Sequence, residues 1–509
     1  MITLDHSADR PLYQQIYEQA RDHIMNGTYR VGTKLPPIRR LADDLEVSRN
    51  TIEAAYLQLS QEGYVTSRTG SGFVVEALDL TTEGTHGQQR EVCCTFTKRL
   101  RQTSLWEDDG EGTEEGNGRS CRLHPASDSA SDGEEEGREG PSPVPTEYDF
   151  TYGNLQGTGF PFQLWRRLTN EALFGCEAWR TGIYGDKLGE RGLRKQIAQR
   201  IHASSGVNCH PAQVVVQAGT QAGLYNLLTL FDPSRDVIAM EEPGYDGARS
   251  VFENARFRLF PVPVYEGNEG FIESLRESHA RLAYVTPSNQ FPTGRILQMS
   301  ARQRLLKWAS AENAYVIEDD YCREFRYTTR PLPSLQSLDR DGRVIYMGTF
   351  SKALSPALRM SYLVLPPDLL FQWNKLFENH YPEVPWLSQT VLESYMEKGY
   401  WGKHLRRAQA QNKRKYQTLV GALQRHMGDR VDVMENGSGL HLLVGARDGR
   451  HQGELIERAA QAGVRVYGTS RYWMNARHPM QNYVLVGFSA IAEDKIEPGI
   501  ERLARAWFD

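Results

Sequence analysis

The stretch GTFSKALSPALRMSYLVLP, residues 348–366, follows the apolar run VIYM at 344–347 and decides how most of this chain is interpreted. Segments with a helical pattern, such as residues 300–312, alternate with short runs rich in β-branched or aromatic residues: VIAM at 237–240, LAYV at 282–285, YVIE at 315–318 and VIYM itself. Short buried strands alternating with helices are typical of a mostly parallel, doubly wound sheet. The sequence therefore predicts an α/β body over residues 148–509.

Lys352 stands in this stretch just after the predicted strand, with Ser351 before it and Arg359 seven residues later. A lysine that forms a Schiff base needs a neutral amine, which burial and nearby cations favour. Arg359 can neutralise a phosphate group, and Ser351 can donate a hydrogen bond to it. Because an ordinary surface lysine at a strand end has the same local pattern, the assignment depends on other segments.

YVIEDDYCREF, residues 315–325, places two acids and a tyrosine at the end of a predicted buried strand. A carboxylate at that point can keep a pyridinium nitrogen protonated, which makes the ring an electron sink. We assign this role to Asp319, with Asp320 as the alternative. We expect the phenol of Tyr321 to bond the 3′ oxygen of the ring.

Two more segments could hold a phosphate and a planar ring. In VVQAGTQAGLYNLL, residues 215–228, a predicted strand runs through Gly219 and Thr220 into a helix, and backbone amides at a helix start bind phosphate. In EEPGYDGA, residues 241–248, Tyr245 follows a strand and offers a face to the ring. Each signal is weak alone, because many strand-to-helix turns and packed loop tyrosines look similar.

In this order, the four segments resemble an aminotransferase of fold type I, and residues 184–201 and 286–294 fit the same family. The resemblance covers about residues 148–509 and implies a large domain with a smaller C-terminal α/β domain. It implies pyridoxal 5′-phosphate as the cofactor, joined to Lys352 as an internal aldimine. The other contacts that it implies are Asp319 at the pyridine nitrogen, Tyr321 at the 3′ oxygen, Tyr245 stacked on the ring, Gly219, Thr220, Ser351 and Arg359 around the phosphate, and Tyr184 at the phosphate of the partner subunit.

Two departures from the aminotransferase pattern affect what this body is expected to do. Phe291 stands immediately before Pro-Thr-Gly, where these enzymes usually have an asparagine, and Asn289 is the candidate to replace it in cofactor binding. Leu and Val at 485–486 stand where an arginine usually holds the substrate's α-carboxylate. We favour Arg471 as the residue that holds an effector carboxylate, with Arg465 as the alternative. A weakened carboxylate anchor predicts at most weak or partial transaminase activity.

The first 78 residues have the pattern of a compact α+β head. Apolar residues at helical spacing predict a helix over 12–24, which Gly27 ends, and a second helix follows a pair of prolines. Ser48 is a good N-cap for a third helix, which only residues 46–47 separate from the second. This spacing is typical of a helix-turn-helix motif.

The predicted third helix would enter the major groove of DNA with its N-terminal end. Arginine there can read guanine or hold phosphate. Strands predicted at 64–67 and 72–75 form a hairpin, interpreted as a wing. A small domain with solvated charges is the alternative, because the head carries eight Lys or Arg against ten Asp or Glu. Five basic residues nevertheless cluster near the third helix: Arg30, Lys34, Arg39, Arg40 and Arg49.

TKLPPIRRLADDLEVSRNTIEAAYLQLSQEGYVTSRTGSGFVV, residues 33–75, resembles the winged helix-turn-helix of the GntR family. The resemblance covers almost all of residues 10–75 and implies double-stranded DNA as a partner. Glu53 occupies a position where some members use a base-reading arginine, so the operator sequence is not implied. The DNA contacts expected from the helices and the wing are Arg39, Arg49, Asn50, Thr51, Arg68, Thr69 and Gly70.

Residues 79–147 separate the head from the body and differ from both in composition. Within 107–139, twelve Asp or Glu stand against three Arg, and Gly and Ser fill most of the rest. Such a segment cannot bury enough apolar surface to offset chain entropy, so we predict a disordered acidic linker with an r.m.s. span of roughly 40–50 Å. Its Cys and His residues lack the regular spacing of metal ligands, so we expect no metal site.

A GntR-like head joined by a linker to an aminotransferase-like body resembles the MocR/GabR subfamily of bacterial transcription regulators. The resemblance implies a head-to-tail homodimer in which an amino acid or amine effector, sensed through external aldimine formation, sets how the heads address DNA. Two alternatives stay open: an active aminotransferase with an accessory head, and a regulator that senses the cofactor itself and controls vitamin B6 synthesis. The chain has no long apolar run and no N-terminal signal region, and its six cysteines in 509 residues form no disulfide scaffold, so we expect a cytoplasmic protein.

Overall fold

The computed structural model describes residues 2–5, 11–45, 47–68, 72–76, 145–176, 178–264, 267–328, 332–435, 437–475 and 478–509. The linker predicted at 79–147 lies outside these residues, except for its last three. The head and the body are therefore described separately.

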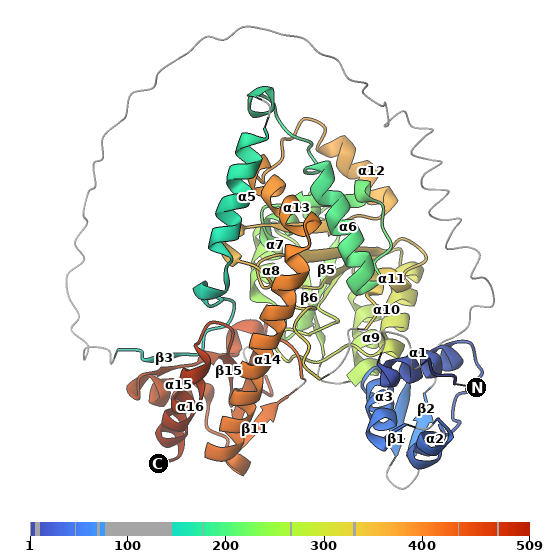
Figure 1. The fold of residues 1–509 in the computed structure, drawn as a ribbon, viewed down its shortest axis with the longest axis vertical. Coiled ribbons are helices and arrows are strands. Elements are labelled where there is room, and N and C mark those ends of the chain that lie inside the picture. The colour runs from blue at the N-terminus through green and yellow to red at the C-terminus, as the bar shows by residue number, and fades with distance from the viewer. Residues whose placement is uncertain are drawn as a thin grey trace. The chain divides into compact units, whose positions relative to one another are not determined.

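The head consists of three helices followed by a two-stranded hairpin, as predicted (Figure 1). The backbone N–H of Thr51 donates to the Oγ of Ser48 at 3.2 Å, which caps the third helix and fixes where it begins. The side chains of Ile16, Ile52 and Leu59 are completely buried between the helices. The elements are α1 (Leu12–Met25), α2 (Ile38–Asp44), α3 (Arg49–Gln61), β1 (Val65–Arg68) and β2 (Gly72–Val75).

The body is built on a seven-stranded sheet with the order β4-β10-β9-β8-β7-β5-β6. The four neighbouring pairs from β9 to β6 are parallel, and β10 is antiparallel to both of its neighbours. This arrangement confirms the predicted, mostly parallel sheet. The strands are β4 (Val214–Gln217), β5 (Val237–Glu242), β6 (Arg258–Pro263), β7 (Leu282–Val285), β8 (Tyr315–Asp319), β9 (Val344–Thr349) and β10 (Ser361–Val364).

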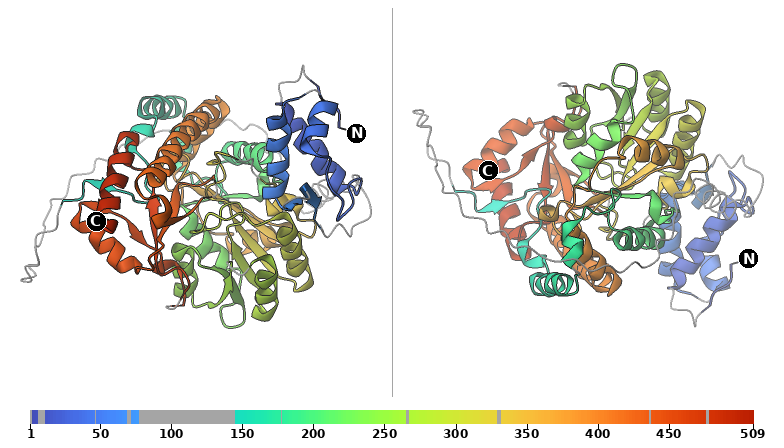
Figure 2. Two further views of the ribbon diagram at one scale, coloured as in Figure 1. Left: turned by 90° about the horizontal axis from the view of Figure 1, so that it is seen from below. Right: turned by 90° about the horizontal axis from the view of Figure 1, so that it is seen from above.

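Helices lie on both sides of this sheet, which explains why β7, β8 and β9 are buried along their whole length (Figure 2). Since β4, β5, β7, β8 and β9 run in the same direction, their carboxyl ends meet at one edge, where ligands of such sheets bind. The helices are α5 (Phe162–Phe174), α6 (Arg191–Ser205), α7 (Thr220–Leu228), α8 (Asp246–Asn254), α9 (Gly267–Ser278), α10 (Met299–Ala311), α11 (Leu335–Leu338), α12 (Pro367–Leu376) and α13 (Trp386–Glu397).

The C-terminal part of the body forms a smaller α/β domain around a sheet with the order β11-β12-β15-β14. A short parallel pair of β13 with β3 brings the first residues of the body to this domain. Trp507 is completely buried here, and its Nε1 donates to the carbonyl of Leu455 at 2.9 Å. The elements are β3 (Tyr148–Asp149), α14 (Tyr400–His426), β11 (Val431–Met434), β12 (His441–Ala446), α15 (Gln452–Gln461), β13 (Val464–Arg465), β14 (Tyr467–Gly468), β15 (Tyr483–Gly487) and α16 (Glu493–Phe508).

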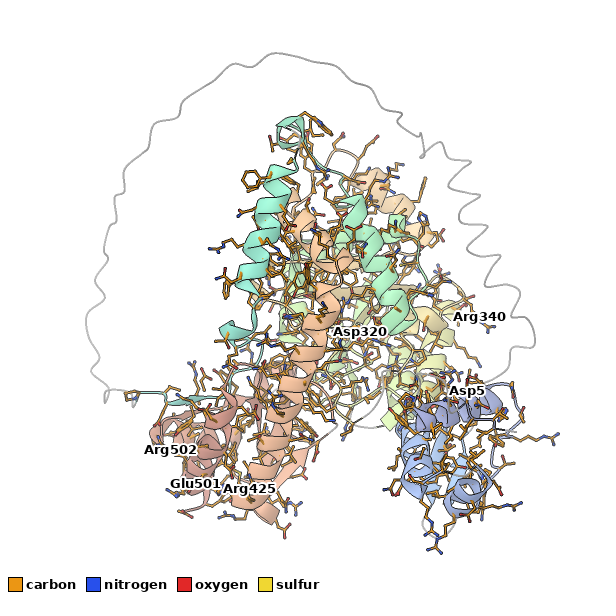
Figure 3. The ribbon with its side chains drawn as sticks, viewed as in Figure 1. Asp5, Asp320, Arg340, Arg425, Glu501 and Arg502 are labelled. Carbon is orange, nitrogen blue, oxygen red and sulfur yellow. The ribbon has the colours of Figure 1, made fainter. Side chains whose placement is uncertain are left out.

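Ion pairs on the surface join α14 to α16. Arg425 lies 2.7 Å from Glu497, and Arg414 lies 3.2 Å from Glu493 (Arg425 is labelled in Figure 3). Such exposed pairs contribute little to stability, so the packing of the two helices carries most of this contact. In the part of the chain that the structure describes, no helix is long and apolar enough to cross a membrane.

Candidate functional site

A cavity of about 160 Å³ lies where the carboxyl ends of the parallel strands meet. The fold brings together seven of the residues that the sequence singled out, and they line this cavity: Thr220, Tyr245, Asp319, Tyr321, Ser351, Lys352 and Arg359. Gln221 also lines it, in the strand-to-helix turn that was predicted to bind phosphate. Sequence reasoning did not single out the other lining residues, Tyr152, Tyr284, Thr286, Thr349 and Pro356.

Lys352 is held inside the cavity by residues at the start of the body. Its Nζ donates to the carbonyl oxygen of Gly153 at 3.2 Å and lies 4.5 Å from the centre of the Tyr152 ring. Burial lowers the pKa of Lys352, although interactions with the neighbouring Cys322 and Asp319 oppose this shift. A larger share of neutral amine follows, which is the form that attacks a carbonyl carbon.

Asp319 ends β8 and presents an unpaired oxygen atom. Its Oδ2 accepts a hydrogen bond from the hydroxyl of Tyr284 at 2.5 Å, whereas its buried Oδ1 has no partner among the described residues. Burial raises the pKa of Asp319 to about 7. A protonated ring nitrogen placed at Oδ1 would supply the missing donor and stabilise the carboxylate.

Asp320, the alternative to Asp319, points elsewhere because successive side chains of an extended chain lie on opposite sides. It does not line the cavity, and its Oδ2 accepts from Tyr346 at 2.9 Å and pairs with Arg323 at 3.2 Å (Figure 3 labels Asp320 in the interior of the body). Its charge is therefore already compensated inside the protein.

Asn289 does not line the cavity but holds Tyr321, which does. The Nδ2 of Asn289 donates to the Tyr321 hydroxyl at 2.9 Å, and that hydroxyl donates to the Asn289 carbonyl at 2.9 Å. Ser438 fixes the amide in turn by donating to its Oδ1 at 3.2 Å. Asn289 therefore orients the phenol, and its position supports an indirect role in cofactor binding.

The opposite end of the cavity is shaped for an anion. Gly219 precedes α7 with φ +95°, and a Cβ atom there would clash with the guanidinium of Arg359. Thr220 and Gln221 form the first turn of α7, whose free backbone amides favour phosphate. Arg359 itself has φ +46°, a strained conformation of the kind that clusters at ligand sites.

Tyr245 and Phe291 supply the aromatic faces of the cavity, with ring centres 5.9 Å apart. Burial raises the pKa of Tyr245 to about 12, so its phenol stays neutral at physiological pH. Together, a buried amine, an unpaired carboxylate oxygen, a flat aromatic surface and an anion cradle fit a phosphorylated pyridine aldehyde.

Arg471 and Tyr184, like Gly219 and Asn289, do not line the cavity. The Nε of Arg471 donates to Asp246 at 2.7 Å, and 65 % of the Arg471 side chain is exposed. Its alternative, Arg465, lies over the ring of Tyr467. Tyr184 is 70 % exposed and stacks on Tyr381 with ring centres 3.7 Å apart, so within one subunit it does not reach the cavity.

In the head, the predicted DNA-contact residues gather on α2 and α3. Arg39, Arg49 and Asn50 are exposed and Thr51 is half-buried, at or before the first turn of α3. The side chain of Arg68, and all of residues 69–70, lie outside the described residues. The exposed N-terminal turn of α3 has the geometry that the motif needs for entry into the major groove.

Known families match both parts of the chain. Residues 12–75 match the family of bacterial regulatory proteins known as the gntR family, and residues 153–472 match the aminotransferase class I and II family. The α-aminoadipate aminotransferase LysN from Thermus thermophilus, solved in complex with N-(5′-phosphopyridoxyl)-L-leucine, superposes with a TM-score of 0.61 at 26 % identity, covering 70 % of this chain and 91 % of that one. The body therefore has the fold type I aminotransferase architecture.

Two curated relatives align along the whole chain. The uncharacterized HTH-type transcriptional regulator YdeL of Bacillus subtilis is 36 % identical, covering 99 % of this chain and 98 % of the relative. The probable rhizopine catabolism regulatory protein MocR of Rhizobium meliloti is 34 % identical, covering 100 % and 96 %. The chain therefore belongs to the MocR/GabR subfamily of GntR-type transcriptional regulators, in which a winged helix-turn-helix head is joined to an aminotransferase-like body.

Proposed function

We propose that this regulator binds pyridoxal 5′-phosphate at Lys352 and senses an amino acid or amine there, which changes how its heads bind a double-stranded DNA operator. The observation that carries the proposal is one cavity that combines the buried amine of Lys352, the unpaired Oδ1 of Asp319 and the anion cradle at Arg359. Each of these groups suits a different part of the same cofactor.

When bound, pyridoxal phosphate supplies an aldehyde carbon that holds one primary amine at a time. Lys352 would hold this carbon, Asp319 would keep the ring nitrogen protonated, and Arg359 with the start of α7 would hold the phosphate. If an effector amine took its place, Lys352 would be released as a free amine and would gain the proton that the effector amine gives up, with no transfer of electrons. The state of the Lys352 nitrogen thereby reports whether an effector is present.

The nitrogen of Lys352 also contacts the segment through which the body is joined to the linker. Its hydrogen bond to the carbonyl of Gly153 depends on whether the nitrogen is free to donate, and β3 lies directly before this segment. Effector binding controls DNA binding only when it favours one arrangement of the protein over another. A tenfold change in DNA affinity requires a difference of about 1.4 kcal/mol.

Replacement of the lysine tests the proposal. In Lys352→Ala, we expect the effector response of DNA binding to disappear, because no amine can exchange at that position. Fluorescence anisotropy of labelled operator DNA, with and without effector, measures this response. Lys403→Ala, at an exposed position on α14, is the matched control. An unchanged effector response in Lys352→Ala would refute the proposal.

A second candidate function is transamination, because Lys352, Asp319 and Tyr321 line one cavity as an aminotransferase requires. Single-turnover absorbance with a panel of amino acids distinguishes the two functions. Rapid conversion of the cofactor to its amine form, reversed by a keto acid, would identify an enzyme. A shift in absorbance without that conversion would identify a sensor.

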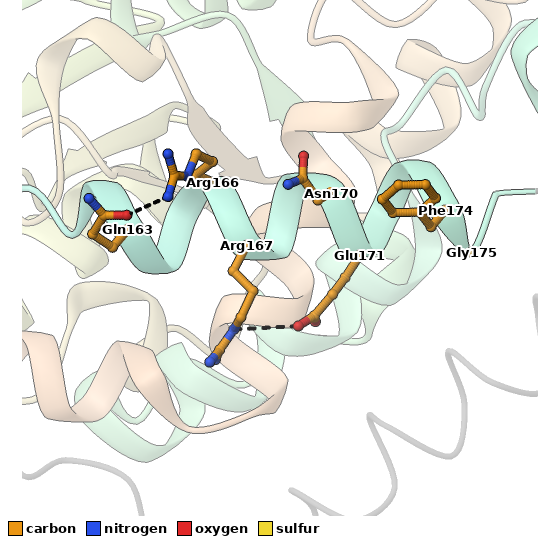
Figure 4. A pocket seen from close by; sticks show the side chains of 7 residues that line it. All are labelled: Gln163, Arg166, Arg167, Asn170, Glu171, Phe174 and Gly175. Atoms are coloured by element: carbon orange, nitrogen blue, oxygen red, sulfur yellow. Dashed lines mark hydrogen bonds and ion pairs between the residues drawn. The ribbon is translucent and has the colours of Figure 1, made fainter.

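We also propose a head-to-tail homodimer. Large apolar side chains are exposed on and near α5, and Phe174 at its end is 91 % exposed (Figure 4). The same helix carries an ion pair of Arg167 with Glu171 at 3.4 Å, so its outer face mixes apolar and charged groups (Figure 4). Large apolar side chains that are exposed close together commonly mark an interface between subunits. The exposed Tyr184 would then be available to the site of the partner subunit.

A further inference from the structure

Aromatic side chains line the cavity beside Lys352. Tyr152 and Phe291 line it there, with ring centres 5.1 Å apart, and we name these two residues with Tyr472 and His441 the aromatic wall. Tyr472 packs 4.8 Å from Phe291, and His441 packs 4.7 Å from Tyr152. Because the Nζ of Lys352 lies 4.5 Å from the Tyr152 ring, the wall stands beside the reacting nitrogen.

One cation lies against the aromatic wall: the guanidinium of Arg471 is 5.6 Å from the ring centre of Tyr472, but this side chain is 65 % exposed, pairs with Asp246 and does not line the cavity. Phe291 belongs to a buried cluster that continues into Leu443, Met480 and Leu485, each at most 6 % exposed. Among the described residues that line the cavity, the only cationic side chains are Lys352 and Arg359, and the guanidinium of Arg359 lies next to Gly219 at the anion cradle. Apolar and aromatic side chains therefore pack around Phe291 where it lines the cavity.

His441 cannot supply the missing charge. Its Nε2 lies 2.7 Å from the carbonyl oxygen of Pro292, which only an N–H can approach favourably, so Nδ1 carries the lone pair. That Nδ1 is buried and has no partner among the described residues. Burial also lowers the pKa of His441 to about 4, so the ring is neutral at physiological pH. A buried lone pair repels a carboxylate and accepts a hydrogen bond from a hydroxyl or an amine.

We infer that the effector is a primary amine that has no carboxylate on its amine-bearing carbon, and that its uncharged body rests against the aromatic wall. This inference rests on the proposed function and narrows the class of molecule that the site accepts. A carboxylate on that carbon would be held near Tyr152 and Phe291, where it would lose its water without gaining a cation. An apolar or aromatic group at the same place gains contact with the rings.

Matched pairs of ligands test the inference on the full-length protein loaded with pyridoxal phosphate. Phenethylamine is compared with L-phenylalanine, and 3-methylbutylamine with L-leucine, because each pair differs only by the carboxylate. The readouts are the cofactor absorbance and, independently, the heat of binding. We expect each amine to act at a concentration roughly a hundredfold or more below its amino acid, since an unpaired buried carboxylate is strongly unfavourable. Equal or tighter binding of the amino acids would overturn the inference.

The ligand pairs distinguish an error in the proposed amine sensing at Lys352 from an error in the inferred class of effector. If neither member of either pair changes the absorbance, the proposal that Lys352 senses amines is wrong, and so is the inferred class of effector. If both members respond equally, only the effector class is wrong.

A variant designed to bind the carboxylate of an amino acid tests the inference independently. Leu485→Arg places a cation behind Phe291, and we expect it to reduce the preference for the amine at least about tenfold, whereas Leu485→Met keeps the preference. A folded Leu485→Arg protein with an unchanged preference would count against the inference. The comparison on the unmodified protein decides the question even if this buried position does not tolerate arginine.

Discussion

Gly219→Ala is expected to weaken cofactor binding far more than it weakens the fold. Gly219 has φ +95° and ψ 164°, a region that only glycine occupies readily, and its missing Cβ leaves room for the guanidinium of Arg359. An alanine would strain the backbone and also push Arg359 away from the first turn of α7. The two effects are separable because only the second one acts on a phosphate.

General energetics give the magnitude of each effect. The backbone strain costs about 1–3 kcal/mol and lowers the stability of the apoprotein. Displacing Arg359 removes a charge-assisted hydrogen bond to the phosphate worth about 1.5–3 kcal/mol. That loss corresponds to a Kd for pyridoxal phosphate raised roughly 10- to 150-fold.

Absorbance titration with pyridoxal phosphate measures the Kd, and urea unfolding of the apoprotein measures the strain. Gly399→Ala is the matched control, because Gly399 has φ +73° but no atom within 4 Å of the position of a Cβ. The control should lose stability and keep its affinity for the cofactor. An unchanged Kd in Gly219→Ala would refute the assignment of Arg359 to the phosphate.

Three further predictions concern the carboxyl, the head and the assembly. Burial raises the pKa of Asp319 to about 7, so the folded apoprotein keeps a proton that the unfolded chain releases near pH 4, and the free energy of unfolding should fall as pH rises between these values. Asp319→Asn should reduce this dependence of the unfolding free energy on pH, measured by urea unfolding at several pH values. An identical pH dependence would contradict the assignment. Arg49→Ala should weaken operator binding roughly 5- to 150-fold in fluorescence anisotropy, whereas Arg425→Ala on α14 should leave it unchanged. Equal effects of the two substitutions would argue against α3 as the helix that enters the major groove. Phe174→Glu should shift the protein towards monomer in light scattering, while Val31→Glu, at an exposed position of the head, should leave the mass unchanged. A variant at Phe174 that stays dimeric would exclude α5 from the interface.

Local patterns predicted the elements of both domains well. The cap at Ser48 depends on a hydroxyl that reaches a backbone N–H three residues later, and the strands at 282–285 and 315–318 depend on runs of apolar residues. Such signals act within a few residues, so they can be recognised from the sequence without knowledge of the tertiary structure.

The cavity was only partly predictable, because several of its residues act through distant contacts. Gly153 and Tyr152 meet Lys352 across about two hundred residues of sequence, and nothing in their own neighbourhood indicates this. Asn289 was predicted from its place near Pro-Thr-Gly, yet its amide is engaged by Tyr321. The sequence predicted Asn289 as a residue of the site but did not predict its hydrogen-bond partner.

By itself, the sequence determined the two-part organisation, the strand-and-helix order of the body and the presence of Lys352 in a strand-end segment, because these follow from composition and periodicity. The tertiary structure placed Asp319, and not Asp320, in the lining of the cavity, since the direction of a side chain at a strand end depends on how that strand is set in its sheet. It also decided that apolar and aromatic groups, rather than a cation, stand beside the lysine nitrogen. The reason is physical: the charge and burial of a site are sums over neighbours that the chain brings together only when it folds.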